Sequence, residues 1–174
     1  MTDSRTLKIL APYVATPPEV VARMLGLAGV GSRDVVYDLG CGDGRICIGA
    51  AKEFGARAVG VDIEPYWIER ARADAADAGV SGLATFHVGD ACYWEVGDAT
   101  VITFYLTIWS TQVMAREVLS RARVGTRVVS HSYLIHGREP ERQEEVVDAS
   151  GDRHRVFMWT VGEDWAPAAD DAPE

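Results

Sequence analysis

The feature that most constrains this chain is a glycine-rich turn between an apolar run and a helical pattern. The run Val35-Val36-Tyr37-Asp38-Leu39 leads directly into Gly40-Cys41-Gly42-Asp43-Gly44, and residues 46–54 then have the composition of a buried helix. Glycine adopts backbone conformations that other residues avoid, and it lets the main chain approach a ligand closely. The segment therefore predicts a strand–turn–helix unit whose turn can bind a ligand.

The remainder of the chain repeats this alternation. Apolar runs predict further strands at 58–62, 85–88, 100–106 and 127–133, and helical patterns occupy 17–26, 65–78 and 112–122. Strands that alternate with helices form a parallel sheet joined by crossover helices. The stretch 137–145 is charged and contains Pro140, so we expect a loop before a last strand at 155–161. Because no helix precedes that strand, it should pair antiparallel at one edge of an α/β, doubly wound sheet.

The length of 174 residues fits one domain. We place this domain at 1–162, with residues 1–30 forming an N-terminal segment and helix over the ligand site. The stretch 163–174 is acidic and contains prolines, so we predict a mobile tail. The sequence shows no internal repeat.

Charge and cysteine usage exclude several classes of protein. The formal net charge is −9, which argues against a partner that is a nucleic acid, because such a surface repels phosphates. The three cysteines form no C-x-x-C pair, and the histidines show no metal-ligand spacing, so we expect no metal site and a reducing, cytoplasmic location. No apolar run is long enough for a membrane span.

The turn itself suggests the kind of ligand. Its glycines, Gly40, Gly42 and Gly44, are spaced one residue closer than the dinucleotide fingerprint G-x-G-x-x-G requires. Asp38 precedes the first glycine by two residues. A carboxylate there would repel a pyrophosphate and attract an ammonium group, so a cationic amino-acid head is favoured over a phosphate.

Two further acidic residues lie at or just after the ends of the next two predicted strands. Asp62 can accept hydrogen bonds from two vicinal ribose hydroxyls, and Ile63 beside it can pack on a purine. Asp90, followed by Ala91, can accept a hydrogen bond from an exocyclic adenine amine. Each aspartate could instead cap a helix. Three of them at the carboxyl ends of successive strands favour a nucleoside ligand, because open α/β sheets bind ligands at that edge.

This set, Asp38 to Gly44 with Asp62 and Asp90, resembles the binding motifs of class I S-adenosylmethionine-dependent methyltransferases. The stretches 12–21, 37–46 and 125–131 are similar to small protein-lysine methyltransferases, including archaeal enzymes and those that methylate the ATP synthase c-subunit. The resemblance implies a seven-strand, Rossmann-like sheet, S-adenosyl-L-methionine as cofactor, and a lysine-bearing protein as substrate. It also implies that Tyr13 and Thr16 contact the methionine end of the cofactor. The net charge of −9 would attract a basic protein.

The methyl acceptor is less constrained. Residues 104–112 depart from the more aliphatic segment expected in these relatives. There, Tyr105 and Trp109 are candidates to line an aromatic pocket, although Trp109 could simply pack as a large side chain. His131 could be a general base or, in our preferred interpretation, a hydrogen-bonded wall residue. A small-molecule N- or O-methyltransferase and a non-catalytic regulatory module remain alternatives, and the chain could act as a monomer or a homodimer.

Overall fold

The computed structural model describes residues 12–165. The helices are α1 (Pro18–Leu27), α2 (Arg45–Phe54), α3 (Pro65–Asp77) and α4 (Ile108–Glu117), and the short 3-10 turns are η1 (Ala91–Tyr93), η2 (Leu119–Arg121) and η3 (Glu163–Trp165). The strands are β1 (Val35–Leu39), β2 (Arg57–Asp62), β3 (Ala84–Val88), β4 (Val101–Phe104), β5 (Arg127–His131), β6 (Arg142–Val147) and β7 (Arg153–Thr160).

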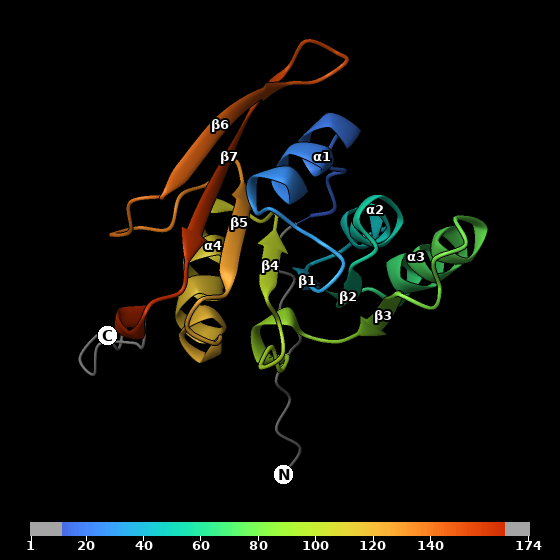
Figure 1. The fold of residues 1–174 in the computed structure, drawn as a ribbon, viewed down its shortest axis with the longest axis horizontal. Coiled ribbons are helices and arrows are strands. Elements are labelled where there is room, and N and C mark those ends of the chain that lie inside the picture. The colour runs from blue at the N-terminus through green and yellow to red at the C-terminus, as the bar shows by residue number, and fades with distance from the viewer. Residues whose placement is uncertain (1–11, 166–174) are drawn as a thin grey trace.

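All seven strands form one sheet in the order β3-β2-β1-β4-β5-β7-β6 (Figure 1). The first five strands pair in parallel, and β7 pairs antiparallel with both β5 and β6. The mostly parallel α/β fold with an antiparallel C-terminal hairpin edge is therefore confirmed. Chain order reverses between β1 and β4, and open sheets of this kind bind ligands outside the carboxyl ends of the strands at such a point.

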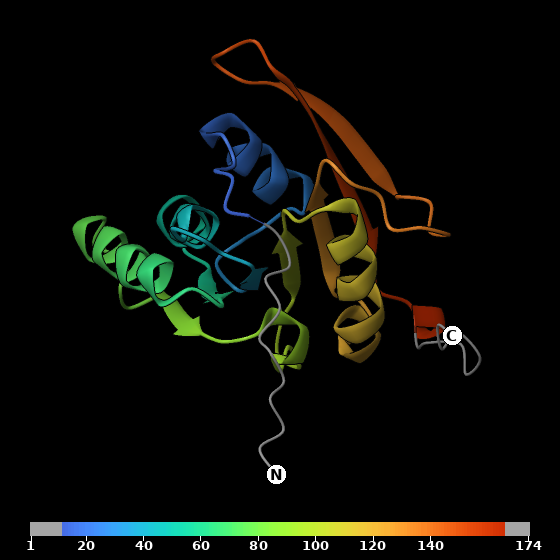
Figure 2. The same ribbon diagram turned by 180° about the vertical axis from the view of Figure 1, so that it is seen from behind.

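Helices cover both faces of the sheet. The first apolar core unites α1, α2 and α3 with one face, and the second unites α4 and η1 with the other. In Figure 2, α4 lies in front of β5, on the face away from α2. Because β1 and β4 are buried on both faces, their sequences read as continuous apolar runs. None of the helices within residues 12–165 is long and apolar enough to cross a membrane.

The sequence-based prediction of a loop at 137–145 is wrong in its second half, because β6 begins at Arg142. This strand lies at the edge of the sheet, where its side chains are exposed or half-buried, so it needs no apolar pattern. The helix predicted at 112–122 is also displaced. It begins at Ile108, where the Thr107 hydroxyl caps it by accepting from the Ser110 amide, 3.2 Å away.

The predicted tail also begins too early. Trp165 in η3 is only 8% exposed and belongs to the second core. The guanidinium of Arg138 lies 4.3 Å from the centroid of its ring and also forms an ion pair with Asp164. The folded part thus extends to Trp165 at least, because this aromatic side chain is anchored in the core. The rest of the predicted tail, 166–174, and residues 1–11 of the N-terminal segment lie outside the described residues.

One glycine of the turn serves the packing of the fold. Gly44 has a φ of +80° and precedes α2. A Cβ atom at this position would lie 2.5 Å from the Phe86 ring and 2.8 Å from the Ala71 Cβ. The residue therefore permits close packing of the turn against β3 and α3.

We predict that Gly44→Ala destabilises the fold by about 2–4 kcal/mol, because strained φ and overpacking add together. Gly79→Ala is the matched control, since Gly79 has a φ of +71° and nothing within 4 Å of its Cβ position. That variant should cost only about 1 kcal/mol. Urea unfolding of both variants measures the difference, and equal losses would contradict the packing role of Gly44.

Candidate functional site

A cavity opens at the carboxyl ends of β1, β2 and β4 and the turn after β3. It is lined by the N-terminal segment 12–16, the glycine turn, the end of β2 with the start of α3, and the first residues after β3 and β4. Nine of the ten residues predicted to bind a cofactor line it, namely Tyr13, Thr16, Asp38, Gly40, Gly42, Asp62, Ile63, Asp90 and Ala91. The tenth, Gly44, lies outside the lining and packs against Phe86.

Asp38 is the most deeply buried acidic residue of the cavity, at 3% exposure. Its Oδ1 accepts a hydrogen bond from the Thr103 hydroxyl, 2.9 Å away. The pKa of Asp38 is raised to about 7, chiefly by burial and also by the carboxylates of Asp62 and Asp43, against the lowering effect of the Thr103 hydrogen bond. A cationic group beside Asp38 would therefore stabilise the ionised carboxylate and offset the effect of burial.

Asp62 joins the glycine turn to the end of β2. Its Oδ2 accepts from the Gly42 amide at 2.8 Å, and its Oδ1 accepts from the Glu64 amide at 3.0 Å. Each carboxylate oxygen has a second lone pair, so both oxygens can still accept from vicinal hydroxyls. The side chain is thus held in place by the backbone while it faces the cavity.

Asp90 occupies the equivalent place after β3. Its Oδ1 accepts from the Cys92 amide at 2.9 Å and caps η1. The two interpretations left open by the sequence, a helix cap and a ligand contact, are therefore compatible here, because Asp90 also lines the cavity.

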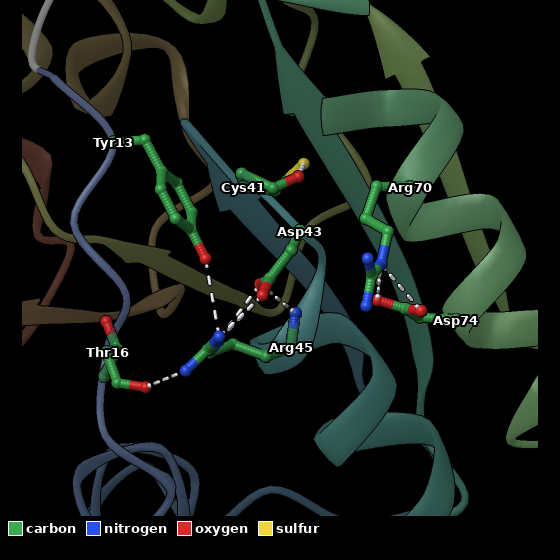
Figure 3. A network of polar contacts seen from close by, with 8 residues as sticks. Tyr13, Thr16, Cys41, Asp43, Arg45, Arg70 and Asp74 are labelled. Atoms are coloured by element: carbon green, nitrogen blue, oxygen red, sulfur yellow. Dashed lines mark hydrogen bonds and ion pairs between the residues drawn. The ribbon is translucent and has the colours of Figure 1, made fainter. Parts of the chain in front are cut away.

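An Asp43–Arg45 pair attaches the N-terminal segment to the turn (Figure 3). The Arg45 guanidinium donates to Asp43 Oδ2 at 2.6 Å, to the Thr16 carbonyl oxygen at 2.9 Å and to the Tyr13 hydroxyl at 3.4 Å. Sequence reasoning missed Arg45, although its place directly after the glycine turn was a usable signal. Asp43 holds this guanidinium and, through it, the chain at residues 13–16.

A stacked aromatic pair completes that side of the cavity. The rings of Tyr13 and Trp67 lie 3.7 Å apart between centroids, with 26° between their planes. A Cβ at Gly42 would lie 2.5 Å from the Tyr13 ring, so glycine leaves the space that this ring fills. Sequence reasoning did not select Trp67. Its signal was its position in the first turn of the helix that follows Asp62.

The three candidates for the acceptor side do not all reach the cavity. Tyr105 lines it, whereas Trp109 is 52% exposed on the first turn of α4 and lies outside the lining. His131 is fully buried, and its ring packs against Tyr105 with centroids 3.9 Å apart and 34° between the ring planes. Burial, with a contribution from His154, lowers the pKa of His131 to about 4, so its ring is neutral at pH 7.

The residues that line the cavity fit a ligand with an ammonium group, a vicinal diol and a purine. Three carboxylates at successive strand ends offer acceptors, and Ile63 and Ala91 offer apolar contact surface. S-Adenosyl-L-methionine carries all of these groups, and the fold places the set at the reversal of strand order. Fold and site together define a class I S-adenosylmethionine-dependent methyltransferase.

Comparison with known proteins agrees with this class. Residues 38–142 match the family model described as the ANTKMT methyltransferase domain. A protein-lysine N-methyltransferase of Saccharolobus islandicus is 41% identical over 87% of this chain and 94% of its own length. A Salinibacter ruber crystal structure, described as an RNA methyltransferase in complex with S-adenosyl-L-homocysteine, is 41% identical and superposes with a TM-score of 0.80, covering 92% of this chain and 100% of that one.

This chain belongs to the ANTKMT methyltransferase domain family. The mouse adenine nucleotide translocase lysine N-methyltransferase is 30% identical over 77% of this chain, but the match covers only 58% of that protein. S-Adenosyl-L-methionine is the cofactor.

We predict that cofactor affinity rises with pH through the range in which Asp38 ionises. Since the pKa of Asp38 is raised to about 7, its carboxyl is mostly protonated at about pH 5.5 and mostly ionised at about pH 7.5. An ammonium group pairs with the ionised form, so the affinity should increase by on the order of tenfold over this interval.

Isothermal titration calorimetry across this interval measures the dependence. Asp38→Asn is the control variant, because its amide cannot ionise. It should bind the cofactor weakly at both pH values and show a flat profile. A flat profile in the unmodified protein would contradict the assignment of Asp38 to the cationic end.

Proposed function

We propose that this methyltransferase transfers a methyl group to the side-chain amine of lysine in a protein. The observation that carries the proposal is the 41% identity to the Saccharolobus islandicus protein-lysine N-methyltransferase, since the alignment covers 94% of that protein. Two mouse lysine N-methyltransferases, one named for the adenine nucleotide translocase and one for the c-subunit of ATP synthase, support the same acceptor chemistry.

The cofactor supplies an electrophilic methyl group, and the cavity supplies binding, orientation and exclusion of water. Asp38, Asp62 and Asp90 are the acceptors that would hold the cofactor. Tyr105 forms an aromatic wall of the same cavity. Because burial against such a wall disfavours an ammonium ion, it lowers the pKa of an entering lysine and favours the neutral, nucleophilic amine.

We assign different roles to the three acceptor-side residues. Tyr105 touches the acceptor. Trp109 lies four residues further on and half exposed, so it contacts the substrate protein outside the cavity. His131 lies behind Tyr105, and in this arrangement it is a wall residue that positions the tyrosine ring.

The Salinibacter ruber protein is named as an RNA methyltransferase, which raises RNA as a second acceptor class. The net charge of −9 on the present chain disfavours a polyanion and is compatible with a basic protein. We therefore propose a protein acceptor and treat RNA and small molecules as outcomes of the test. A cytoplasmic location and a monomeric or homodimeric state stay predictions.

Incubation with radiolabelled S-adenosyl-L-methionine and a methylation-deficient cell extract tests the acceptor class. We expect label in protein that survives ribonuclease, is lost with proteinase, and appears by mass spectrometry as N-methylated lysine. The Asp62→Ala variant, which lacks the proposed ribose contacts, is the control and should give no label. Label that is lost with ribonuclease, or that remains in small molecules, would overturn the proposal.

The aromatic wall gives a separate prediction. Tyr105→Ala removes the ring from the cavity and should lower kcat/KM for the acceptor by about tenfold or more, since alignment and exclusion of water are lost. Tyr105→Phe keeps the ring and should retain most of the activity. Steady-state kinetics with saturating cofactor distinguish the two, and an equal loss in both variants would assign the role to the hydroxyl group instead.

A further inference from the structure

One polar side chain interrupts the apolar interior of β4. The strand reads Val101-Ile102-Thr103-Phe104, and all four residues are buried, with Thr103 at 0% exposure. A valine would fill about the same volume without a hydroxyl, and burying a hydroxyl that lacks a partner is costly. The hydroxyl of Thr103 therefore calls for a reason beyond packing.

Strand pairing places this hydroxyl beside the most deeply buried carboxyl of the cavity. β1 and β4 are parallel neighbours where the strand order reverses, and Asp38 is the register partner of Thr103. Thr103 Oγ1 lies 2.9 Å from Asp38 Oδ1 and 3.5 Å from the Tyr37 carbonyl oxygen. Because an ionised carboxylate only accepts hydrogen bonds, the one hydrogen of the hydroxyl is donated to Asp38 across the shorter distance.

The two oxygens of the Asp38 carboxyl have different surroundings. Among residues 12–165, Thr103 is the one donor to Oδ1, and no donor reaches Oδ2. Oδ2 is also not one of the buried side-chain polar atoms without a partner, which in this part of the chain are Thr111 Oγ1 and His131 Nδ1. Since Asp38 lines the cavity, its Oδ2 is therefore open to the cavity.

The carboxyls near Asp38 oppose its ionisation. Burial is the largest cause that raises its pKa, and Asp62 at the end of β2 and Asp43 in the glycine turn raise it as well. Of the groups that act on this carboxyl, only Thr103 lowers the pKa, through its hydrogen bond.

Two thiols complete the titratable surroundings of Asp38. Cys41 in the glycine turn and Cys47 on α2 both interact with this carboxyl, and burial raises the pKa of each thiol, so both are uncharged at neutral pH. Within residues 12–165, the Thr103 hydroxyl is thus the one contact that stabilises the Asp38 carboxylate before a cationic ligand arrives.

We propose that Thr103 is a positioning residue for cofactor binding: its hydroxyl holds Oδ1 of Asp38 so that Oδ2 faces the ammonium group of S-adenosyl-L-methionine as an ionised acceptor. Thr103 does not line the cavity, so it acts on the cofactor only through Asp38. This role is independent of the methyl acceptor, whether that is a protein, an RNA or a small molecule.

Thr103→Val removes the hydroxyl and keeps the volume of the side chain. In the cofactor-free protein, the Asp38 carboxyl should then ionise at a pH about one unit higher, since its charged form has lost a hydrogen bond while burial is unchanged. ¹³C spectra of the aspartate carboxyl groups follow this titration, and Asp38→Asn identifies the resonance. Thr103→Ala also lacks the hydroxyl and should shift the titration in the same direction. Thr103→Ser keeps the hydroxyl and should titrate as the unmodified protein does.

The same change should weaken cofactor binding. At pH 7.5 we expect the dissociation constant for S-adenosyl-L-methionine, measured by calorimetry, to rise on the order of tenfold in Thr103→Val. The reason is that less of the Asp38 carboxyl is ionised and its orientation is no longer fixed. Thr103→Ser should bind the cofactor nearly as well as the unmodified protein.

Thr126→Val is the matched control. Thr126 is also buried, at 2% exposure, and its hydroxyl donates to the Ala99 carbonyl oxygen 3.1 Å away, just before β5. This variant should lose stability in urea unfolding and leave the Asp38 titration and the dissociation constant unchanged. An unchanged Asp38 titration in Thr103→Val would overturn the inference, as would an equal shift in Thr103→Ser. Label found only in RNA would reject the lysine proposal and leave these measurements as they are.

Discussion

The site depends on how the backbone after β1 is turned back against β2. The amides of Gly40 and Cys41 both donate to the Val61 carbonyl oxygen, at 2.8 and 3.0 Å, and the Gly42 amide donates to the Asp62 carboxylate. Left-handed φ values at the three glycines of the turn make this path possible. One carboxylate thus closes the turn and also faces the cavity, so the binding site needs no structure beyond the fold itself.

The two sides of the cavity come from different parts of the chain. Strands β1 to β3, with the N-terminal segment, carry the carboxylates and the Tyr13–Trp67 stack. Strands β4, β5 and β7 carry Tyr105 and the histidines behind it. Because different elements carry the two sides, changes on the acceptor side can alter transfer while cofactor binding persists.

Local chemistry explains how much could be predicted from the sequence. The parallel strands and the three aspartates were recognisable because the buried strands are mostly apolar and each carboxylate lies at or just after the carboxyl end of one. β6 was missed because an edge strand with Arg142 and Glu144 exposed or half-exposed carries no such pattern. The hydrogen bond between His131 and His154 was missed because it depends on how β5 pairs with β7. The sequence alone does not specify the register of that pairing. The stacked Trp67 required knowledge of where residues 12–16 cross the turn.

The position of the hairpin after the parallel strands in the chain also orders assembly. During synthesis the carboxylates of β1, β2 and the turn after β3 leave the ribosome before β6 and β7. Until β7 pairs with β5, the strand that carries Val128 and Val129 has an unpaired edge. The nascent protein therefore forms its cofactor-binding residues early and the contact between His131 and His154 last. An enzyme truncated before the hairpin would keep the cofactor-binding residues but would expose an aggregation-prone edge of β5.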